Sequence, residues 1–546
     1  MTRRQGLAVA IATAIVAVSR WPALSRTFWD WDEAQFILAL RHFDVAAHHP
    51  HPPGFPLFIG AAKLLQIAGL DSFHALQAVS LAAAVLIVPA MTAFALAAGA
   101  EFATALTAGI VLAFFPNVWF YGGTALSDVP SMTAVVIAIA LLLRSERLAM
   151  YGGAIAAGIA IGIRPQNLVI VAVPFLLAIA RHRMRAIGPV LLTASIVVAS
   201  YGAAIAATGG WAVFAEALRR HREYLSRVDA WTSPNRPPLT HLVDDFFIRP
   251  YRAQLINAVT SVLAAVALLR HRRAALMALA AFGPFCLIAW LMLDRFSVSR
   301  FAVGYAPLFA MLAAEGLAAM GRRGRYAFAA IYVGLMIVWT WPALQIVHST
   351  VSPPFAAAMW LREHTTGAVC AEPGLTAFAE VLAPEKTLRT GVWSAADGDV
   401  LLREGRGVIT FSRLHGHLWN LARRRYFEVS ISPAVSPFIF GDGWYGMESD
   451  RKEVWRWMRS RSRITITAPC RSLSIDFYAP DRTASITMFA DGRRLDRLPA
   501  SSEFPRTYAV QSPRELVIET DRVVQNAGDP RELGLRLNGI ECGAGQ

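Results

Sequence analysis

The chain has 546 residues, of which 55% are hydrophobic and only 16% are charged. Soluble proteins carry about a quarter charged residues, so this composition excludes an ordinary soluble enzyme and indicates a polytopic membrane protein. The net charge of +14 would suit nucleic-acid binding, but the basic residues lie in short clusters between apolar stretches. That distribution is typical of cytoplasmic loops under the positive-inside rule, and it excludes nucleic acid as a partner.

The N-terminal apolar run, 6–18, resembles the core of a signal peptide. It leads into Arg20-Trp21-Pro22 without a convincing small-residue cleavage site, which favours an uncleaved first span. Further apolar stretches recur up to Val347. By the criterion of roughly twenty residues we expect about eleven spans, at 6–24, 74–98, 102–120, 126–144, 150–164, 165–181, 186–208, 252–270, 273–293, 300–320 and 324–347.

The basic clusters between these spans determine the predicted topology. With Arg3 and Arg4 inside, the other arginine clusters between spans also fall on the cytoplasmic side, and the acid-bearing loops fall outside. This alternation requires that residues 55–70 do not cross the membrane. That segment is short and carries Lys63 and Gln66, so we expect it to lie in or dip into the interface. The N-terminus is thus predicted to be cytoplasmic, and the region after the last span extracytoplasmic.

The first extracytoplasmic loop contains the acidic sequence FWDWDEAQF, residues 28–36. Asp30 and Glu33 have the spacing of a capping box that opens a helix over 33–43. The box leaves Asp32 unused, and a carboxylate there is suited to act as a general base that the helix N-terminus keeps ionised. Capping and membrane anchoring alone are the alternative explanation of this motif.

A histidine- and proline-rich sequence, HHPHPPGF, follows at 48–55. Imidazoles bind divalent metals, so His49 and His51 are candidate ligands of a metal ion. Extended proline-rich backbone does not place consecutive side chains on one face, however. The alternative is a rigid turn that sets the direction of the next helix.

Asp128 lies at the outer start of a predicted span, in the sequence SDVP at 127–130. Either Ser127 or Asp128 could cap that helix, which is the common use of such residues. The functional alternative is an acid that faces a cavity shared with the first loop, because ionisable residues at membrane depth usually mark functional sites.

Three arginines also fall on the outer side under this topology: Arg164, Arg295 and Arg300. An arginine within the membrane is costly unless it is paired or faces water, although one at a helix end can extend its charged head to the interface. The planar guanidinium matches a phosphate, so these residues are candidates to bind a lipid-linked phosphate, with Lys63 as a further substrate contact.

Five short motifs resemble those of the GT-C superfamily of membrane glycosyltransferases, which includes protein O-mannosyltransferases and lipid A aminoarabinose transferase. In chain order they are DEAQF at 32–36, HPPGFPLF at 51–58, SDVP at 127–130, RP at 164–165 and RFAVGYAP at 300–307. The resemblance covers residues 1–347. It implies a GT-C-like catalytic module over that range.

The resemblance also implies an activity. A sugar would move, with inversion, from a polyprenyl-phosphate donor to a hydroxyl of a glycan, lipid or protein acceptor at the outer face of a bacterial-type inner membrane. Asp32 would be the general base, and Glu33 and Asp128 would orient the acceptor or hold a metal. No cofactor other than a divalent metal is implied, and the crowded histidines depart from the family pattern.

Two other classes of function fit the composition. A transporter or flippase of a lipid-linked sugar would also be polytopic, and a non-enzymatic cell-envelope assembly protein could use its C-terminal region as its working part. Transporters often show internal repeats and ionisable residues near the midplane. The chain has no evident repeat, and its ionisable residues gather at one surface, which favours the transferase.

The C-terminal region predicts two soluble domains. Residues 352–435 alternate helix-like and strand-like pieces, which indicates a small α/β domain. Residues 436–546 hold short alternating segments separated by turns, which indicates a β-sandwich. Trp444 and Trp457 lie in a sequence that resembles carbohydrate-binding-like jelly rolls. They would either stack on sugars or pack in the core.

The chain has four cysteines, and Cys286 lies in an apolar span. The other three, Cys370, Cys470 and Cys542, lie in the C-terminal region. An extracytoplasmic location permits a disulfide there. We expect it between Cys470 and Cys542.

Overall fold

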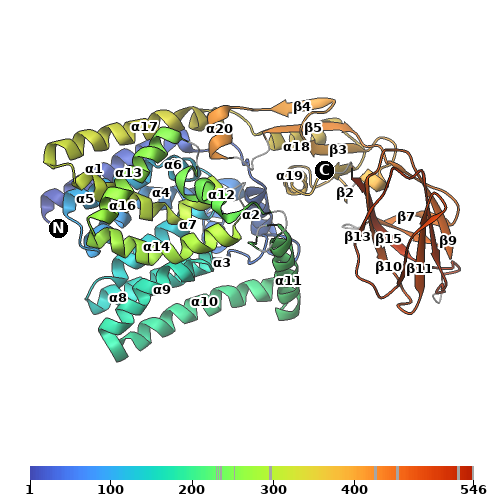
Figure 1. Ribbon diagram of the computed structural model, residues 1–546, viewed down its shortest axis with the longest axis horizontal. Helices are drawn as coiled ribbons and strands as arrows, with labels where there is room; N and C mark the ends of the chain where they lie inside the picture. Colours follow the sequence, from blue (N-terminus) through green and yellow to red (C-terminus); the bar gives the residue numbers. More distant parts are fainter. Residues whose placement is uncertain are drawn as a thin grey trace. The chain divides into compact units, whose positions relative to one another are not determined.

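The computed structural model describes the chain except for residues 229, 232, 234–235, 251–252, 294–297, 391, 423–426, 450–453, 526–528 and 544–546. The chain divides into two compact units. The first consists of Met1–Ser352 with Arg413–Phe427, and the second of Pro353–Ser412 with Glu428–Gln546. Figure 1 shows that the first unit is built from helices and that strands dominate the second.

The helices of the first unit occupy every stretch that was expected to span a membrane. They are α1 (Arg3–Ser19), α2 (Trp31–Arg41), α3 (Pro56–Ile67), α4 (Ser72–Ala97), α5 (Phe102–Phe114), α6 (Pro116–Tyr121), α7 (Asp128–Leu142), α8 (Arg147–Ile163), α9 (Asn167–His182), α10 (Ile187–Ala207), α11 (Trp211–Val228), α12 (Leu239–Val243), α13 (Gln254–Leu269), α14 (Arg273–Met292), α15 (Val298–Phe301), α16 (Ala306–Ala318), α17 (Arg322–Ser349) and α20 (Gly416–Leu421).

Five helical segments within the described part of the chain are long and apolar enough to cross a membrane. They are Ser72–Ala97, Asn167–Ala207, Arg273–Met292, Val298–Ala318 and Gly324–His364, and shorter apolar helices accompany them. The protein is therefore a multi-pass membrane protein. The number of about eleven spans stays a prediction.

The helix that follows the proline-rich turn is short. α3 has 12 residues, so it is about 18 Å long, against the ~30 Å of a bilayer's hydrocarbon core. Leu64 and Ile67 are exposed on it. The turn before it uses Gly54 at φ +105 and Phe55 at φ +50. Positive φ is natural for glycine and uncommon for phenylalanine, so the turn holds the Phe55 ring in a specific direction.

The loop that precedes α7 is fixed by buried hydrogen bonds. A Cβ on Gly123 would lie 1.7 Å from the carbonyl oxygen of Ala23, so only glycine fits this approach. The Gly123 oxygen accepts hydrogen bonds from the Ser25 amide at 3.0 Å and from Nε2 of Gln77 at 2.8 Å. Ser80 Oγ donates to the carbonyl of residue 126 at 2.6 Å. These contacts set the position at which α7, and with it Asp128, begins.

The second unit begins with an α/β region. Its five-stranded sheet has the order β2-β1-β3-β5-β4, with β1 parallel to β2 and β3 and with β5 antiparallel to β3 and β4. The elements are α18 (Pro353–His364), β1 (Val369–Ala371), α19 (Thr376–Leu382), β2 (Leu388–Thr390), β3 (Val400–Glu404), β4 (Ile409–Ser412) and β5 (Glu428–Pro433).

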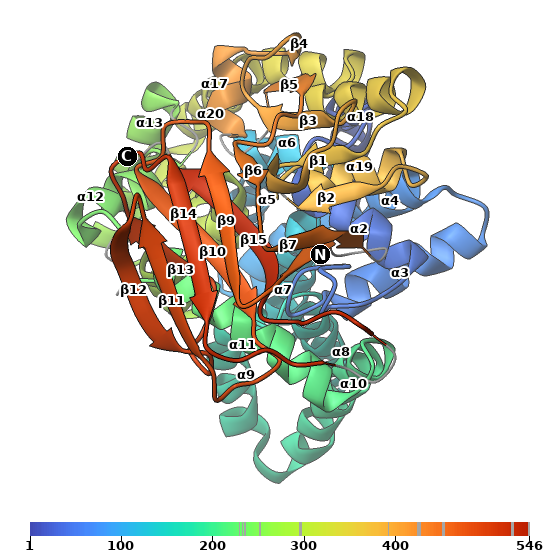
Figure 2. The same ribbon diagram turned by 90° about the vertical axis from the view of Figure 1, so that its right-hand side faces the viewer.

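Two further five-stranded sheets, β13-β10-β15-β8-β7 and β12-β11-β14-β9-β6, enclose one hydrophobic core and form a β-sandwich (Figure 2). The disulfide predicted between Cys470 and Cys542 is present. Trp444 packs at the edge of the core, where its ring meets Phe440 edge-on. The strands are β6 (Phe438–Phe440), β7 (Trp444–Ser449), β8 (Val454–Met458), β9 (Arg461–Ile466), β10 (Ser472–Tyr478), β11 (Ser485–Ala490), β12 (Arg493–Pro499), β13 (Arg506–Ala509), β14 (Glu515–Thr520) and β15 (Arg536–Gly543).

One segment differs from the expected division of the chain. Residues 413–427 were expected to belong to the α/β domain, but they leave β4, form α20 and return to β5 while packing with the first unit. Leu418 and Leu421 of α20 are buried. The burial of these two side chains among transmembrane helices accounts for the difference.

Candidate active site

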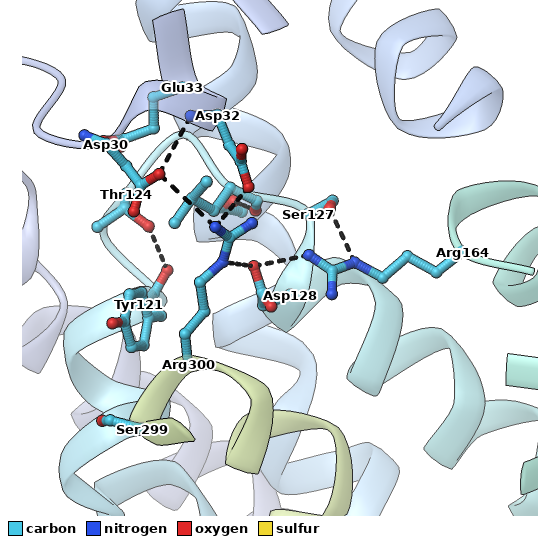
Figure 3. A network of polar contacts seen from close by, with 12 residues as sticks. Asp30, Asp32, Glu33, Tyr121, Thr124, Ser127, Asp128, Arg164, Ser299 and Arg300 are labelled. Atoms are coloured by element: carbon cyan, nitrogen blue, oxygen red, sulfur yellow. Dashed lines mark hydrogen bonds and ion pairs between the residues drawn. The ribbon is translucent and has the colours of Figure 1, made fainter. Parts of the chain in front are cut away.

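Arg300 of α15 lies at the centre of a network of acids that are distant in sequence (Figure 3). Its Nη1 lies 2.5 Å from Oδ2 of Asp32 and 3.6 Å from Oδ1 of Asp30. Its Nε donates to Oδ2 of Asp128 at 2.9 Å. The guanidinium therefore joins the first loop to the start of α7.

Arg164, at the end of α8, completes the network. Its Nη2 lies 2.9 Å from Oδ2 of Asp128, and its Nε donates to Oγ of Ser127 at 3.0 Å. The ring of Phe55 faces its guanidinium at 5.5 Å, a cation–π distance. The unusual backbone of the proline-rich turn thus serves to place Phe55 against Arg164.

The charges of this network are buried. Arg300 is 8% exposed and Asp128 3%, and an isolated charge in such surroundings would cost several kcal/mol. Three carboxylates, those of Asp30, Asp32 and Asp128, face two guanidinium groups. The two guanidinium groups meet at Oδ2 of Asp128, and each carries five N–H donors in all. Guanidinium donors of this kind suit an anionic ligand.

Glu33 is buried next to the network but points elsewhere. Its Oε2 accepts hydrogen bonds from the amides of Trp29 at 2.7 Å and Asp30 at 2.8 Å, which completes the predicted capping box. Its Oε1 accepts a hydrogen bond from the amide of Ala125 at 2.9 Å. Glu33 therefore ties the helix that bears Asp32 to the loop before Asp128.

His51 lies on the other side of Asp32. Its Nδ1 is 2.9 Å from Oε1 of Gln35 and 3.5 Å from Oδ1 of Asp32. Its ring packs edge-on against Phe55. Burial lowers the pKa of His51 to about 4, although the Asp32 charge opposes this shift. The imidazole is therefore neutral at physiological pH, and the two oxygens of Asp32 face an uncharged and a charged partner.

The cluster does not fit a divalent metal. Asp32 and Asp128 already bond Arg300, and two guanidinium groups in the same space repel a cation. Among the described residues no group of three or more His, Cys, Asp or Glu side chains is placed to hold a metal ion. His49 and His51, which the sequence suggested as ligands, gain no third ligand there. We therefore assign no metal ligands.

Two other expected site residues lie outside the network. Lys63 is exposed, and its Nζ donates to the carbonyl of Leu40 at 2.8 Å and to Oε1 of Gln66 at 2.9 Å. It supports the interfacial helix rather than the cluster. Arg295 falls outside the described residues, so its role stays a prediction.

Some contacts of the site were not foreseen. Asp30 was assigned to capping alone, yet it also lies near Arg300. Ser127 was expected as a cap, but its hydroxyl serves Arg164 instead. The Pro-Pro-Gly sequence before Phe55 predicts a tight turn, and this turn is the feature of the sequence that could have indicated the contact of Phe55 with Arg164.

A cleft lies directly beside the network. It has an empty volume of about 300 Å³, open solvent included, and Asp128 and Arg164 line it together with Ser131 and Asn167. Phe301, the residue after Arg300, forms part of its wall. The guanidinium of Arg164 borders this cleft.

No family model and no curated protein sequence matches the chain. Its structure is similar to that of ArnT from Cupriavidus metallidurans bound to undecaprenyl phosphate, with 15% identity and a TM-score of 0.50 over 70% of this chain and 86% of that chain. ArnT from the same organism in the apo state has 14% sequence identity and a TM-score of 0.47, over 79% of this chain and 98% of that chain. The apo oligosaccharyltransferase from Archaeoglobus fulgidus has 12% identity and a TM-score of 0.43, over 69% of this chain and 64% of that chain. The chain thus has the fold of GT-C membrane glycosyltransferases, as the motifs predicted.

Proposed function

We propose that the protein is an inverting glycosyltransferase that moves a sugar from a polyprenyl-phosphate donor to an acceptor hydroxyl. The observation that carries this proposal is the buried network of Asp32, Arg300, Asp128 and Arg164, built from the motifs of the first unit. The fold supports it, because ArnT has a similar fold and binds undecaprenyl phosphate.

In this proposal Arg164 and Arg300 bind the donor phosphate. Their guanidinium groups lie together at Oδ2 of Asp128, and Arg164 lines the adjacent cleft. A phosphate adds negative charge to a cluster in which acids already outnumber arginines. For that reason we retain Arg295 as a third phosphate ligand, whereas Lys63 keeps only an interfacial role.

Asp32 is the proposed general base. The acceptor oxygen attacks the anomeric carbon while the bond from that carbon to the phosphate oxygen breaks, so the polyprenyl phosphate leaves with the bonding electrons. The acceptor proton passes to Oδ1 of Asp32, because Arg300 holds Oδ2. A phosphate is already a good leaving group, so the reaction needs no general acid. Asp128 positions both arginines.

The proposed topology places this chemistry at the outer face of a bacterial-type inner membrane, with about eleven spans and a cytoplasmic N-terminus. The disulfide between Cys470 and Cys542 supports an oxidising, extracytoplasmic location for the C-terminal region. We keep the division into a catalytic module at 1–347, an α/β domain at 352–435 and a carbohydrate-binding-like jelly roll at 436–546, except that residues 413–427 pack with the first unit. The acceptor is a glycan, a lipid or a protein.

The test is transfer by the purified protein. It is incubated in nanodiscs with a panel of polyprenyl-phosphate sugars and a mixture of cell-envelope glycans, lipids and proteins, and product is detected by mass spectrometry. We expect one donor to lose its sugar to an acceptor with inverted configuration. A parallel assay in liposomes measures movement of the same donors between leaflets. Movement without sugar transfer would show a flippase and contradict the proposal.

A further inference from the structure

The short helix α6 is hydrogen-bonded to the backbone of the residue before Arg300. Nδ2 of Asn117 donates to the carbonyl oxygen of Ser299 at 2.9 Å, and Ser299 directly precedes Arg300. Asn117 is 2% exposed, and its Oδ1 accepts a hydrogen bond from the amide of Val118 at 3.0 Å. The nitrogen and the oxygen of the Asn117 side-chain amide therefore both form hydrogen bonds, which fixes the orientation of this side chain.

The other end of α6 is hydrogen-bonded to α20. The hydroxyl of Tyr121 donates to the carbonyl oxygen of Leu421 in α20 at 2.9 Å, and Tyr121 is buried. The carbonyl oxygen of Tyr121 accepts a hydrogen bond from Oγ1 of Thr124 at 2.9 Å. Figure 3 shows Tyr121 between Thr124 and Ser299, on the same side of the network as the backbone of Arg300.

α20 is itself anchored to α17. Nδ1 of His417 bonds the carbonyl oxygen of Trp339 at 2.8 Å, and the two rings stack with centroids 4.3 Å apart. Leu418 and Leu421 are buried beneath them. The chain reaches α20 from β4 and leaves it for β5, so α20 is the connection of a strand pair in the second unit.

We propose that α6 is a brace that positions Arg300, with Asn117 as the positioning residue and α20 as the anchor of the brace. α15 has four residues, and a single helical turn is not stable without tertiary contacts. The hydrogen bond from Asn117 supplies such a contact one residue before Arg300. A displacement of about 1 Å at a positioning group can cost 10²-fold in rate.

This inference rests on the proposed function in one respect only, the assignment of the donor phosphate to Arg300. Through the brace, α20 contributes to the position of Arg300 by way of α6. α20, which belongs to the first unit although it lies far along the chain, is hydrogen-bonded to the far end of α6, and α6 is hydrogen-bonded to the residue before Arg300. None of the five family-like motifs includes Asn117, Tyr121 or α20.

Three variants test the brace. Asn117→Leu removes the donor to Ser299, and Tyr121→Phe removes only the hydroxyl that reaches α20. Thr124→Val is the matched control, because it removes a buried hydroxyl that bonds only the backbone carbonyl of Tyr121 and leaves the bonds of Asn117 to Ser299 and of the Tyr121 hydroxyl to Leu421 in place. Binding of undecaprenyl phosphate is measured in nanodiscs. Loss of one buried hydrogen bond should weaken binding by about 5- to 10-fold in Asn117→Leu, by less in Tyr121→Phe, and not in Thr124→Val.

A double-mutant cycle separates positioning from general stability. If Asn117 acts through Arg300, Asn117→Leu should weaken binding no further in an Arg300→Ala background. An equal effect in both backgrounds, or an equal loss in Thr124→Val, would overturn the brace.

Hydrogen exchange of residues 298–305 gives a readout that does not depend on the ligand. It should quicken in Asn117→Leu and Tyr121→Phe and stay unchanged in Thr124→Val, and unchanged exchange in all three would also overturn the brace. Wild-type protein that fails to bind undecaprenyl phosphate would contradict the proposed donor while the exchange result still decides the brace.

Discussion

Ion pairs of the same chemical type lie in opposite surroundings in the two units. In the sandwich, Nε of Arg461 lies 3.2 Å from Oε1 of Glu519 across paired strands, and the two side chains are 69% and 38% exposed. In the first unit, Arg300 and Asp32 are 8% and 16% exposed and belong to a network. Exposed pairs contribute about 0–1 kcal/mol. Burial makes the removal of one partner costly without making the intact pair strongly stabilising.

This difference indicates what each kind of pair is for. The pair of Arg461 and Glu519 is one of several exposed contacts, and its loss leaves both charges in water. The network of Arg300 cannot lose one member without leaving another charge buried. Buried ionic groups are therefore better explained by a function that needs them than by stability.

The largest effect is expected from Asp32→Asn. A positioned base is typically worth about 10²–10⁴-fold in rate, so turnover should fall by at least that range. Asparagine has nearly the same shape, so the fold should persist, which near-ultraviolet circular dichroism can check. The matched control is Glu519→Gln in the sandwich, which should leave turnover unchanged. Near-normal turnover in Asp32→Asn together with an inactive Asp128→Asn would assign the base elsewhere.

Removal of Arg300 should affect stability as well as activity. Arg300→Ala leaves Asp32 and Asp128 without their shared partner, which typically costs about 3–5 kcal/mol for a buried pair. Arg300→Lys keeps the charge but not the planar fork, so it should restore part of the stability and less of the donor affinity. Arg461→Ala should cost at most about 1 kcal/mol. Thermal unfolding in detergent measures all three, and equal losses for Arg300→Ala and Arg461→Ala would contradict the comparison.

Glu33→Gln separates a structural acid from a catalytic one. The carboxylate accepts hydrogen bonds from three amides, and glutamine has only one oxygen to offer. The variant should lose about 1–3 kcal/mol of stability because a buried amide donor is left unsatisfied. Turnover per folded molecule should fall much less than in Asp32→Asn. A stable but inactive Glu33→Gln would instead make Glu33 part of the chemistry.

Local sequence was sufficient to predict much of the fold. The short strands expected between residues 436 and 546 are present as a β-sandwich, and the capping box of Asp30 and Glu33 is present. These features depend on alternation and on spacing within one turn, which a single segment contains in full. The extracytoplasmic location permitted a disulfide, and the expected pair of Cys470 and Cys542 is present, although nothing in the compartment or composition selects it over Cys370.

The contacts between distant segments were less predictable. The motifs suggested that Asp32, Asp128, Arg164 and Arg300 share a site, but not that Arg300 would bond both acids. Asp32 and Arg300 are 268 positions apart, so no local pattern encodes their pairing. α20 was assigned to the wrong part of the chain because its sequence shows no periodicity that distinguishes packing on membrane helices from packing on a sheet.

The smallest effect is expected from pH, through His51. Burial lowers its pKa to about 4 from an ordinary value of 6.5. The unfolded chain therefore takes up a proton as pH falls through 6.5, while the folded protein does not until about pH 4. The contribution of His51 to the free energy of unfolding is thus fully present above pH 6.5 and is lost progressively between pH 6.5 and pH 4. From pH 7 to 6 the loss is less than about 1 kcal/mol.

Thermal unfolding of wild type and of His51→Gln in detergent at pH 7, 6 and 5 measures this loss. The variant lacks the titrating ring, so the difference in unfolding temperature should shift in favour of the variant as the pH falls. A constant difference for His51→Gln would contradict the lowered pKa and, with it, the neutral imidazole placed beside Oδ1 of Asp32.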